Sequence, residues 1–125
     1  MQAHTNHLRY HRDIYLPVAL AAQAQRTVEA YRTTFRLTHH ARERAMEKGV
    51  LMPTALPEQG IDLIEVSCLP GTNEFWACLI RFDHGDGVND LCLVLSHQGA
   101  VITWFLNEKR DSHRTLNPRV YQRRP

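Results

Sequence analysis

The first regular pattern in the chain is helical. Between residues 17 and 32 the sequence is rich in alanine and glutamine, and it places Val18, Ala21 and Val28 at the spacing of one helix face. Pro17 stands at the start of this stretch, where the first turn of a helix tolerates proline. The pattern therefore predicts a helix over 17–32.

A second helical pattern follows residue 38. Thr38 is a residue type that often caps a helix N-terminus, strong helix formers come next, and Gly49 is the type that often ends a helix. The spacing predicts a buried stripe made of Leu37, Ala41, Ala45 and Met46. His40 and Arg44, four residues apart, are expected to lie together at the edge of that stripe.

Beyond Gly60 the pattern changes to that of β-strands. Pro53 and Pro57 exclude a long regular element just before it. Runs rich in apolar, β-branched and aromatic residues cover 61–69, 74–82, 91–96 and 100–106. The connections between them are short and contain glycine, as hairpins often do where the backbone takes a positive φ. We therefore expect an α+β fold, with N-terminal helices packed on a four-stranded antiparallel sheet.

The length of 125 residues and the hydrophobic content of 43% are those of one domain. We expect a single domain over 1–125, with a core over about 17–107 and a polar, basic tail over 108–125. No apolar run is long enough to span a membrane, and the N-terminus lacks the apolar segment of a secretory signal. These features favour a cytoplasmic protein that does not contact a membrane.

The net charge of +2 hides an uneven distribution. Acidic residues gather between Glu58 and Asp90, whereas the tail contains Arg110, Arg114, Arg119, Arg123 and Arg124. A basic tail suits a polyanion such as RNA, but a solvated chain end that binds nothing has the same composition. Charge alone leaves both interpretations open.

Neither cysteine chemistry nor a metal site is expected. Cys68, Cys78 and Cys92 lie in apolar runs, where burial raises the pKa of a thiol, and their spacing is not that of a disulfide scaffold. Asp83 and Asp86 lie in a short glycine-rich loop that lacks the length and the bidentate glutamate of a calcium loop. We expect free buried thiols, no metal and no cofactor.

The second helical stretch, LTHHARERAMEKGV, resembles a family of unknown function found in bacteria and phages. The positions that carry the resemblance follow the pattern Thr-x-His-Ala-x-x-Arg-x-x-x-x-Gly and are Thr38, His40, Ala41, Arg44 and Gly49. That family is similar to the metal-independent ribonuclease toxins, which include barnase, the colicin nucleases and RelE. The resemblance covers about 35–121 and implies a helical part packed on a four-stranded antiparallel sheet.

A toxin-like ribonuclease or RNA-binding domain is the function that the resemblance implies. Cleavage without a metal needs a proton acceptor for the ribose 2′-OH and cations for the phosphate. Histidine and arginine suit these tasks, so the candidate catalytic residues are His40, Arg44 and His113. The candidate substrate-binding residues are Arg114, Thr103, Arg81 and Tyr121. RNA and a cognate antitoxin would then be the partners.

Other interpretations of the same residues stay open. A helix rich in charged residues is often only a polar face, and His40 could instead hydrogen-bond a backbone carbonyl and hold the helix to the sheet. The chain could also be a non-catalytic adaptor or inhibitor, encoded by a phage or a bacterium, that binds a protein through a strand edge or its acidic loops. The low net charge weighs against the ribonuclease interpretation.

Overall fold

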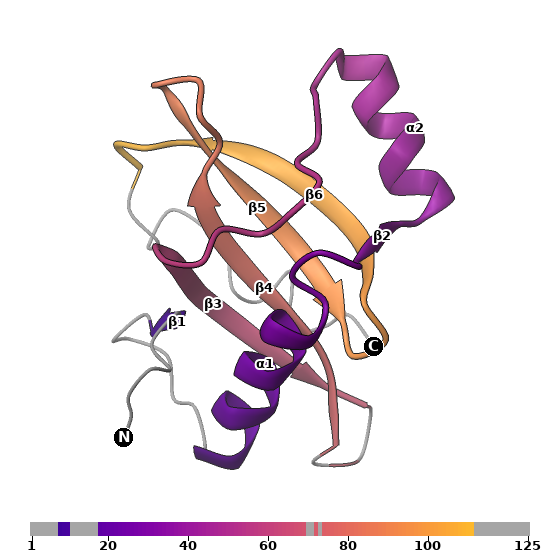
Figure 1. The fold of residues 1–125 in the computed structure, drawn as a ribbon, viewed down its shortest axis with the longest axis vertical. Coiled ribbons are helices and arrows are strands. Elements are labelled where there is room, and N and C mark those ends of the chain that lie inside the picture. Colours follow the sequence, from indigo (N-terminus) through magenta and orange to yellow (C-terminus); the bar gives the residue numbers. More distant parts are fainter. Residues whose placement is uncertain (1–7, 11–17, 70–71, 73, 112–125) are drawn as a thin grey trace.

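The computed structural model describes residues 8–10, 18–69, 72 and 74–111, and Figure 1 shows their arrangement. The helices of this part are α1 (Val18–Ala30) and α2 (His39–Lys48). Its strands are β1 (Leu8–Tyr10), β2 (Arg36–Leu37), β3 (Ile61–Cys68), β4 (Phe75–Asp83), β5 (Asn89–Ser96) and β6 (Ala100–Glu108). Together these strands form one six-stranded sheet in the order β1-β3-β4-β5-β6-β2.

The α+β class is confirmed, but the expected four-stranded, purely antiparallel sheet needs correction. β3, β4, β5 and β6 form the antiparallel meander, while β1 joins β3 and β2 joins β6 as parallel neighbours. Arg36 and Thr38 hold β2 in place, since their N–H groups donate to the carbonyls of Gly99 (2.9 Å) and Val101 (3.1 Å). Strands as short as β1 and β2 leave no periodic pattern in a sequence.

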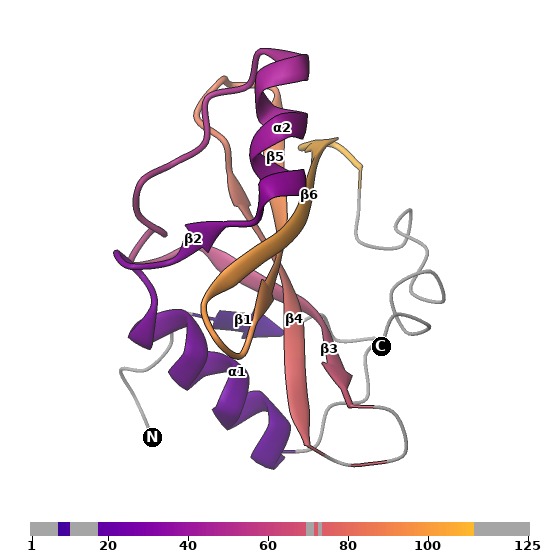
Figure 2. The ribbon, with the colours of Figure 1, turned by 90° about the vertical axis from the view of Figure 1, so that its right-hand side faces the viewer.

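α1 is shorter than the predicted helix over 17–32. It ends at Ala30, where the chain turns, and Pro17 lies outside the described residues. Ala24 and Val28 are almost fully buried and belong to the same apolar cluster as the sheet residues beneath them. Figure 2 shows that α1 and α2 lie on the same side of the sheet.

α2 begins and ends where its capping residues predict. The hydroxyl oxygen of Thr38 accepts a hydrogen bond from the Ala41 N–H (3.2 Å), and Gly49 ends the helix in a left-handed conformation with φ of +66°. Ala41 and Ala45 are buried, as expected. The expectation for Met46 is wrong, because this side chain is 76% exposed. Met46 lies about 100° around the helix from Ala45, which turns it away from the sheet.

Apolar residues are buried on both faces of the sheet. On the face that the helices cover, a row of paired positions crosses β3 to β6 and consists of Leu63, Ile80, Leu93 and Trp104. The opposite face, which we call the second face, has its own cluster, made of Ile64, Ala77, Leu79, Cys92 and Val94. Burial on both faces accounts for the nearly continuous apolar runs of β4 and β5.

The cysteines carry free thiols. Cys78 and Cys92 are buried, and burial raises the pKa of each thiol to about 12, so neither is a nucleophile near neutral pH. Cys68, the last residue of β3, is only partly buried. The expectation of buried thiols is therefore confirmed for Cys78 and Cys92, and it is wrong for Cys68.

Replacing Gly99 with alanine is expected to destabilise the fold. Gly99 has a φ of +82°, and a Cβ there would stand 2.4 Å from the ring of Tyr31. Gly87 has a similar φ of +79° with open space around it, so Gly87→Ala measures the conformational cost alone, about 1 kcal/mol. In urea-induced unfolding, Gly99→Ala should cost at least about 2 kcal/mol more than Gly87→Ala. Equal losses would contradict the steric contact.

Candidate functional site

α2 is held against β6 by a reciprocal contact between Arg44 and Trp104. The indole N–H of Trp104, a buried residue, donates to the main-chain carbonyl of Ala41 at 3.0 Å. In return, Nε of Arg44 donates to the main-chain carbonyl of Trp104 at 3.2 Å, and the guanidinium carbon lies 5.5 Å from the indole centroid. The Thr38 hydroxyl also donates to the Ile102 carbonyl at 3.3 Å. We call these contacts the α2–β6 clamp.

His40 and Arg44 have different surroundings, although they are one turn apart. Arg44 is partly buried in the clamp, whereas His40 is exposed to solvent. One interpretation of the sequence was that His40 hydrogen-bonds a backbone carbonyl and holds the helix to the sheet. In the structure, Arg44 makes this contact instead. Nε of Arg44 and the face of its guanidinium are thus already in contact with Trp104, before any ligand binds.

The exposed side of α2 carries mixed charge. We call it the outer face of α2, and its exposed residues are His39, His40, Arg42, Glu43, Met46, Glu47 and Lys48. Nε2 of His39 lies 3.1 Å from a carboxylate oxygen of Glu43, one turn further along. Because acidic and basic residues are interspersed, this face lacks the excess of cations that contact with a nucleic acid requires.

Arg81, a candidate for substrate binding, is only 2% exposed and lies on the second face of the sheet. Its Nε donates to Asp90 at 2.8 Å, and its Nη2 donates to the main-chain carbonyls of Glu108 (3.1 Å) and Asp111 (2.9 Å). Within the part of the chain that the structure describes, Nη1 makes no hydrogen bond. These contacts join β4, β5 and the end of β6, so Arg81 fastens one corner of the sheet.

Lys109 extends this network to the turn between β4 and β5. Its Nζ lies 2.6 Å from Oδ1 of Asp83 and 3.1 Å from Oδ1 of Asp90. Partial burial acts to raise the pKa of Asp90, but the hydrogen bonds from Arg81 and Lys109 outweigh it and lower the pKa. The pKa of Asp83 is lowered chiefly by the hydrogen bond from Lys109. Both carboxylates are ionised at neutral pH, which makes them poor general acids.

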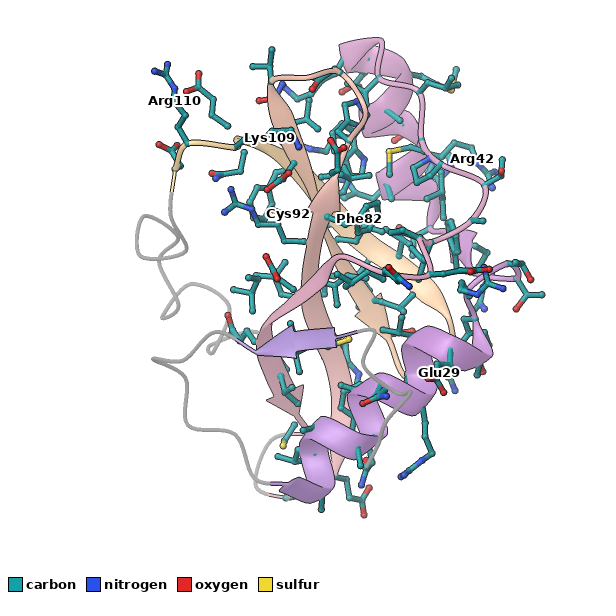
Figure 3. All side chains as sticks on the ribbon, turned by 60° about the vertical axis from the view of Figure 1, so that its left-hand side comes forward. Glu29, Arg42, Phe82, Cys92, Lys109 and Arg110 are labelled. Atoms are coloured by element: carbon teal, nitrogen blue, oxygen red, sulfur yellow. The ribbon has the colours of Figure 1, made fainter. Side chains whose placement is uncertain are left out.

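Thr103 lies on the second face as well, since its paired position on β5 belongs to the second-face cluster. α2 packs on the other face through its two buried alanines. Figure 3 shows Arg42 of α2 on one side of the sheet and Lys109 on the other. The sheet therefore separates Arg81 and Thr103 from the candidate residues on α2.

The remaining candidates, His113, Arg114 and Tyr121, lie outside the described residues, and their roles stay predictions. The sequence pattern does not predict the contacts of two further residues, Trp104 with α2 and Asp90 with Arg81. A signal for Trp104 was present, because a buried tryptophan needs an acceptor for its N–H group. The contact of Asp90 with Arg81 depends on the register of the hairpin, which composition does not reveal.

The loop between β4 and β5 is organised by its own carboxylates. Asp86 accepts hydrogen bonds from the N–H groups of Val88 (2.9 Å) and Asn89 (2.7 Å) and from the side-chain amide of Asn89 (2.9 Å). These bonds, with the Asn89 N–H foremost, lower the pKa of Asp86 to about 2. Among the described residues, no group of three His, Cys, Asp or Glu side chains is arranged to hold a metal ion.

A shallow hollow of about 230 Å³ lies between α1 and the segment before β3. Its walls are Val28, Glu29, Arg32, Pro57 and Glu58. Arg32 lies 3.7 Å from Glu58 across it. The walls contain neither a nucleophile nor a histidine, so the hollow lacks the groups that the expected ribonuclease chemistry requires.

No protein-family model, curated protein or solved structure matches this chain. In the described residues, no helix has the length and apolar character needed to cross a membrane.

Truncation of Arg44 should weaken the α2–β6 clamp. Arg44→Ala is expected to lower the free energy of unfolding by about 1–2 kcal/mol, because it removes a hydrogen bond and the contact with the indole. The control is Arg42→Ala on the outer face, which should change it by less than about 0.5 kcal/mol. Chemical denaturation at neutral pH measures both. Equal losses would show that the clamp contributes no stability.

The Asp86 carboxylate should stabilise the fold only while it is ionised. Folding lowers its pKa from an ordinary 3.8 to about 2, so its contribution is complete well above 3.8 and is lost as the pH falls through 2. Wild type should therefore melt at a higher temperature than Asp86→Ala near neutral pH. That difference should shrink between about pH 4 and pH 2. A difference in melting temperature that is the same at pH 2 as at neutral pH would contradict stabilisation by the ionised Asp86 carboxylate.

Proposed function

We propose that this chain is a non-catalytic domain that binds a protein partner through the outer face of α2. Support comes from large apolar side chains exposed at the C-terminal end of that helix. Met46 is 76% exposed and Leu51 is 89% exposed, and the chain turns at Gly49 between them. Water in contact with such side chains is unfavourable, so a partner that covers them gains free energy.

The surroundings of Met46 favour a protein over a nucleic acid. Arg42 and Lys48 are balanced by Glu43 and Glu47, so the charge around the apolar side chain is close to neutral. Protein interfaces combine an apolar centre with a polar rim. Nucleic acids instead require an excess of cations along the contact. A protein surface is therefore the better fit.

The α2–β6 clamp prepares the outer face for binding. Trp104 and Arg44 fix the helix on the sheet from its inner side, which leaves His40, Arg42 and Met46 exposed. A surface that is ordered before association loses little conformational freedom when a partner docks. The stability of the clamp and the affinity for the partner are thus linked.

The ribonuclease function implied by the family resemblance has less support. Cleavage of RNA requires a base, an acid and phosphate-binding cations around one point. Arg44 is engaged with Trp104, and Arg81 is buried on the opposite face of the sheet. The candidate residues that the structure describes do not converge on one site.

Site-specific cross-linking tests the proposed binding face. A photoreactive amino acid in place of Met46 should give a discrete product with a protein in cells that express this chain, and Leu51→Asp should reduce its yield by about tenfold. Arg26, exposed on α1, is the control position and should not give that product. The proposal fails if Met46 gives no product or if both positions give the same one.

Incubation with total RNA in EDTA tests the non-catalytic part of the proposal. The RNA should remain intact even when the protein is in excess. Degradation by wild type that folded His40→Ala or Arg44→Ala variants do not cause would overturn the proposal. That outcome would support the toxin-like ribonuclease.

A further inference from the structure

β6 forms the border of the sheet for most of its length. β5 pairs with one side of β6 from Val101 to Glu108, whereas β2 pairs with the other side only at Ala100 and Val101. From residue 102 to residue 108, no strand in the described part of the chain lies along that other side, which we call the free edge of β6. Figure 2 shows α2 beside this edge, where Arg44 contacts the strand.

Main-chain groups of Trp104 and Leu106 point out of the free edge. The N–H of Lys109 donates to the carbonyl of Val88 at 2.9 Å, and hydrogen-bonded pairs alternate along an antiparallel ladder. Counting back from this pair, alternate residues bond to β5, and Trp104 and Leu106 face outward. The Trp104 carbonyl accordingly accepts a hydrogen bond from Arg44 of α2. Among the described residues, the N–H and the carbonyl of Leu106 have no main-chain partner.

The side chains along the free edge do not block the addition of a strand. Exposed edges are commonly protected by charged residues, lysine above all, or by proline. The sequence of residues 102–107, ITWFLN, contains neither a charged residue nor proline. It is rich in the β-branched and aromatic residues that favour strands. The free edge is therefore suited to pairing with another strand.

Opposite charges lie at the two ends of the free edge, on the face of the sheet that the helices cover. Nε of Arg44 donates to the Trp104 carbonyl, which leaves two Nη groups without an acceptor among the described residues. Glu108, four residues further along β6, is exposed. Alternate side chains of a strand share a face, so Glu108 lies on the same face as Trp104. A cation therefore stands beside one end of the edge and an anion at the other.

We propose that the free edge of β6 pairs antiparallel with the same edge of a second copy of this chain, with Leu106 opposite Leu106. In this register Trp104 of each copy lies opposite Glu108 of the other, with about 5.5 Å between the Cα atoms. Arg44, bound to the Trp104 carbonyl, then meets the Glu108 carboxylate of the second copy, and the two-fold axis forms this ion pair twice. The proposal does not rest on the proposed function, because it does not use Met46.

Sedimentation equilibrium of the purified full-length protein measures the association. With increasing protein concentration, the average mass should rise from that of one chain toward that of two. Glu108→Arg brings like charges together at both ends of the pairing and should raise the Kd of the dimer by at least about tenfold. Glu74→Arg, the same exchange at an exposed position before β4, is the control and should leave the Kd unchanged. A chain that stays monomeric, or equal effects of the two variants, would overturn the proposal.

A nuclear Overhauser contact between Hα atoms tests the register. In the proposed dimer, Phe105 lies opposite Asn107 of the second copy in a non-hydrogen-bonded pair, where the Cα atoms are only about 4.5 Å apart. Within one molecule the two residues are roughly 7 Å apart along the same strand, so a contact between their Hα atoms reports pairing between copies. A mixture of ¹³C-labelled and unlabelled protein should show this contact. A dimer without it, such as one formed through Met46, would overturn the proposal.

Discussion

Trp104 lies between the sheet and α2, where its indole N–H reaches the Ala41 carbonyl of the helix while Arg44 reaches back to the strand. The helix residues buried at this contact, Ala41 and Ala45, are small, which lets the helix backbone approach the sheet closely enough for a hydrogen bond of 3.0 Å. α2 is thereby fixed on the sheet from its inner side. Arg44, which could otherwise bind phosphate, is part of this contact. The packing of α2 therefore determines which of its side chains can reach a ligand.

The sheet divides the molecule into two surfaces with different properties. On one side, the outer face of α2 combines balanced charge with an exposed Met46. On the other, the second face buries an apolar cluster together with Glu65 and Arg81. An exposed apolar side chain favours a partner from outside, because covering it removes apolar surface from water.

Local rules predicted those parts of the fold that depend on neighbours in sequence. Thr38 and Gly49 marked the ends of α2, and apolar runs marked the four long strands, because caps and strand patterns act within a few residues. The short parallel strands and the direction of Arg44 depend on which distant segment lies alongside, as the contact with Trp104 shows. Residue type made Arg44 a candidate catalytic residue, whereas its contact with Trp104 depends on its surroundings in the fold.

A double-mutant cycle between Arg44 and Trp104 tests the central claim most directly. Free energies of unfolding are measured for wild type, Arg44→Ala, Trp104→Leu and the double variant. If Arg44 stabilises the fold through its contact with the indole, the double variant should lose about 1 kcal/mol less than the sum of the single losses. Single losses that add to within about 0.3 kcal/mol would show that the two side chains act independently, and would contradict the account.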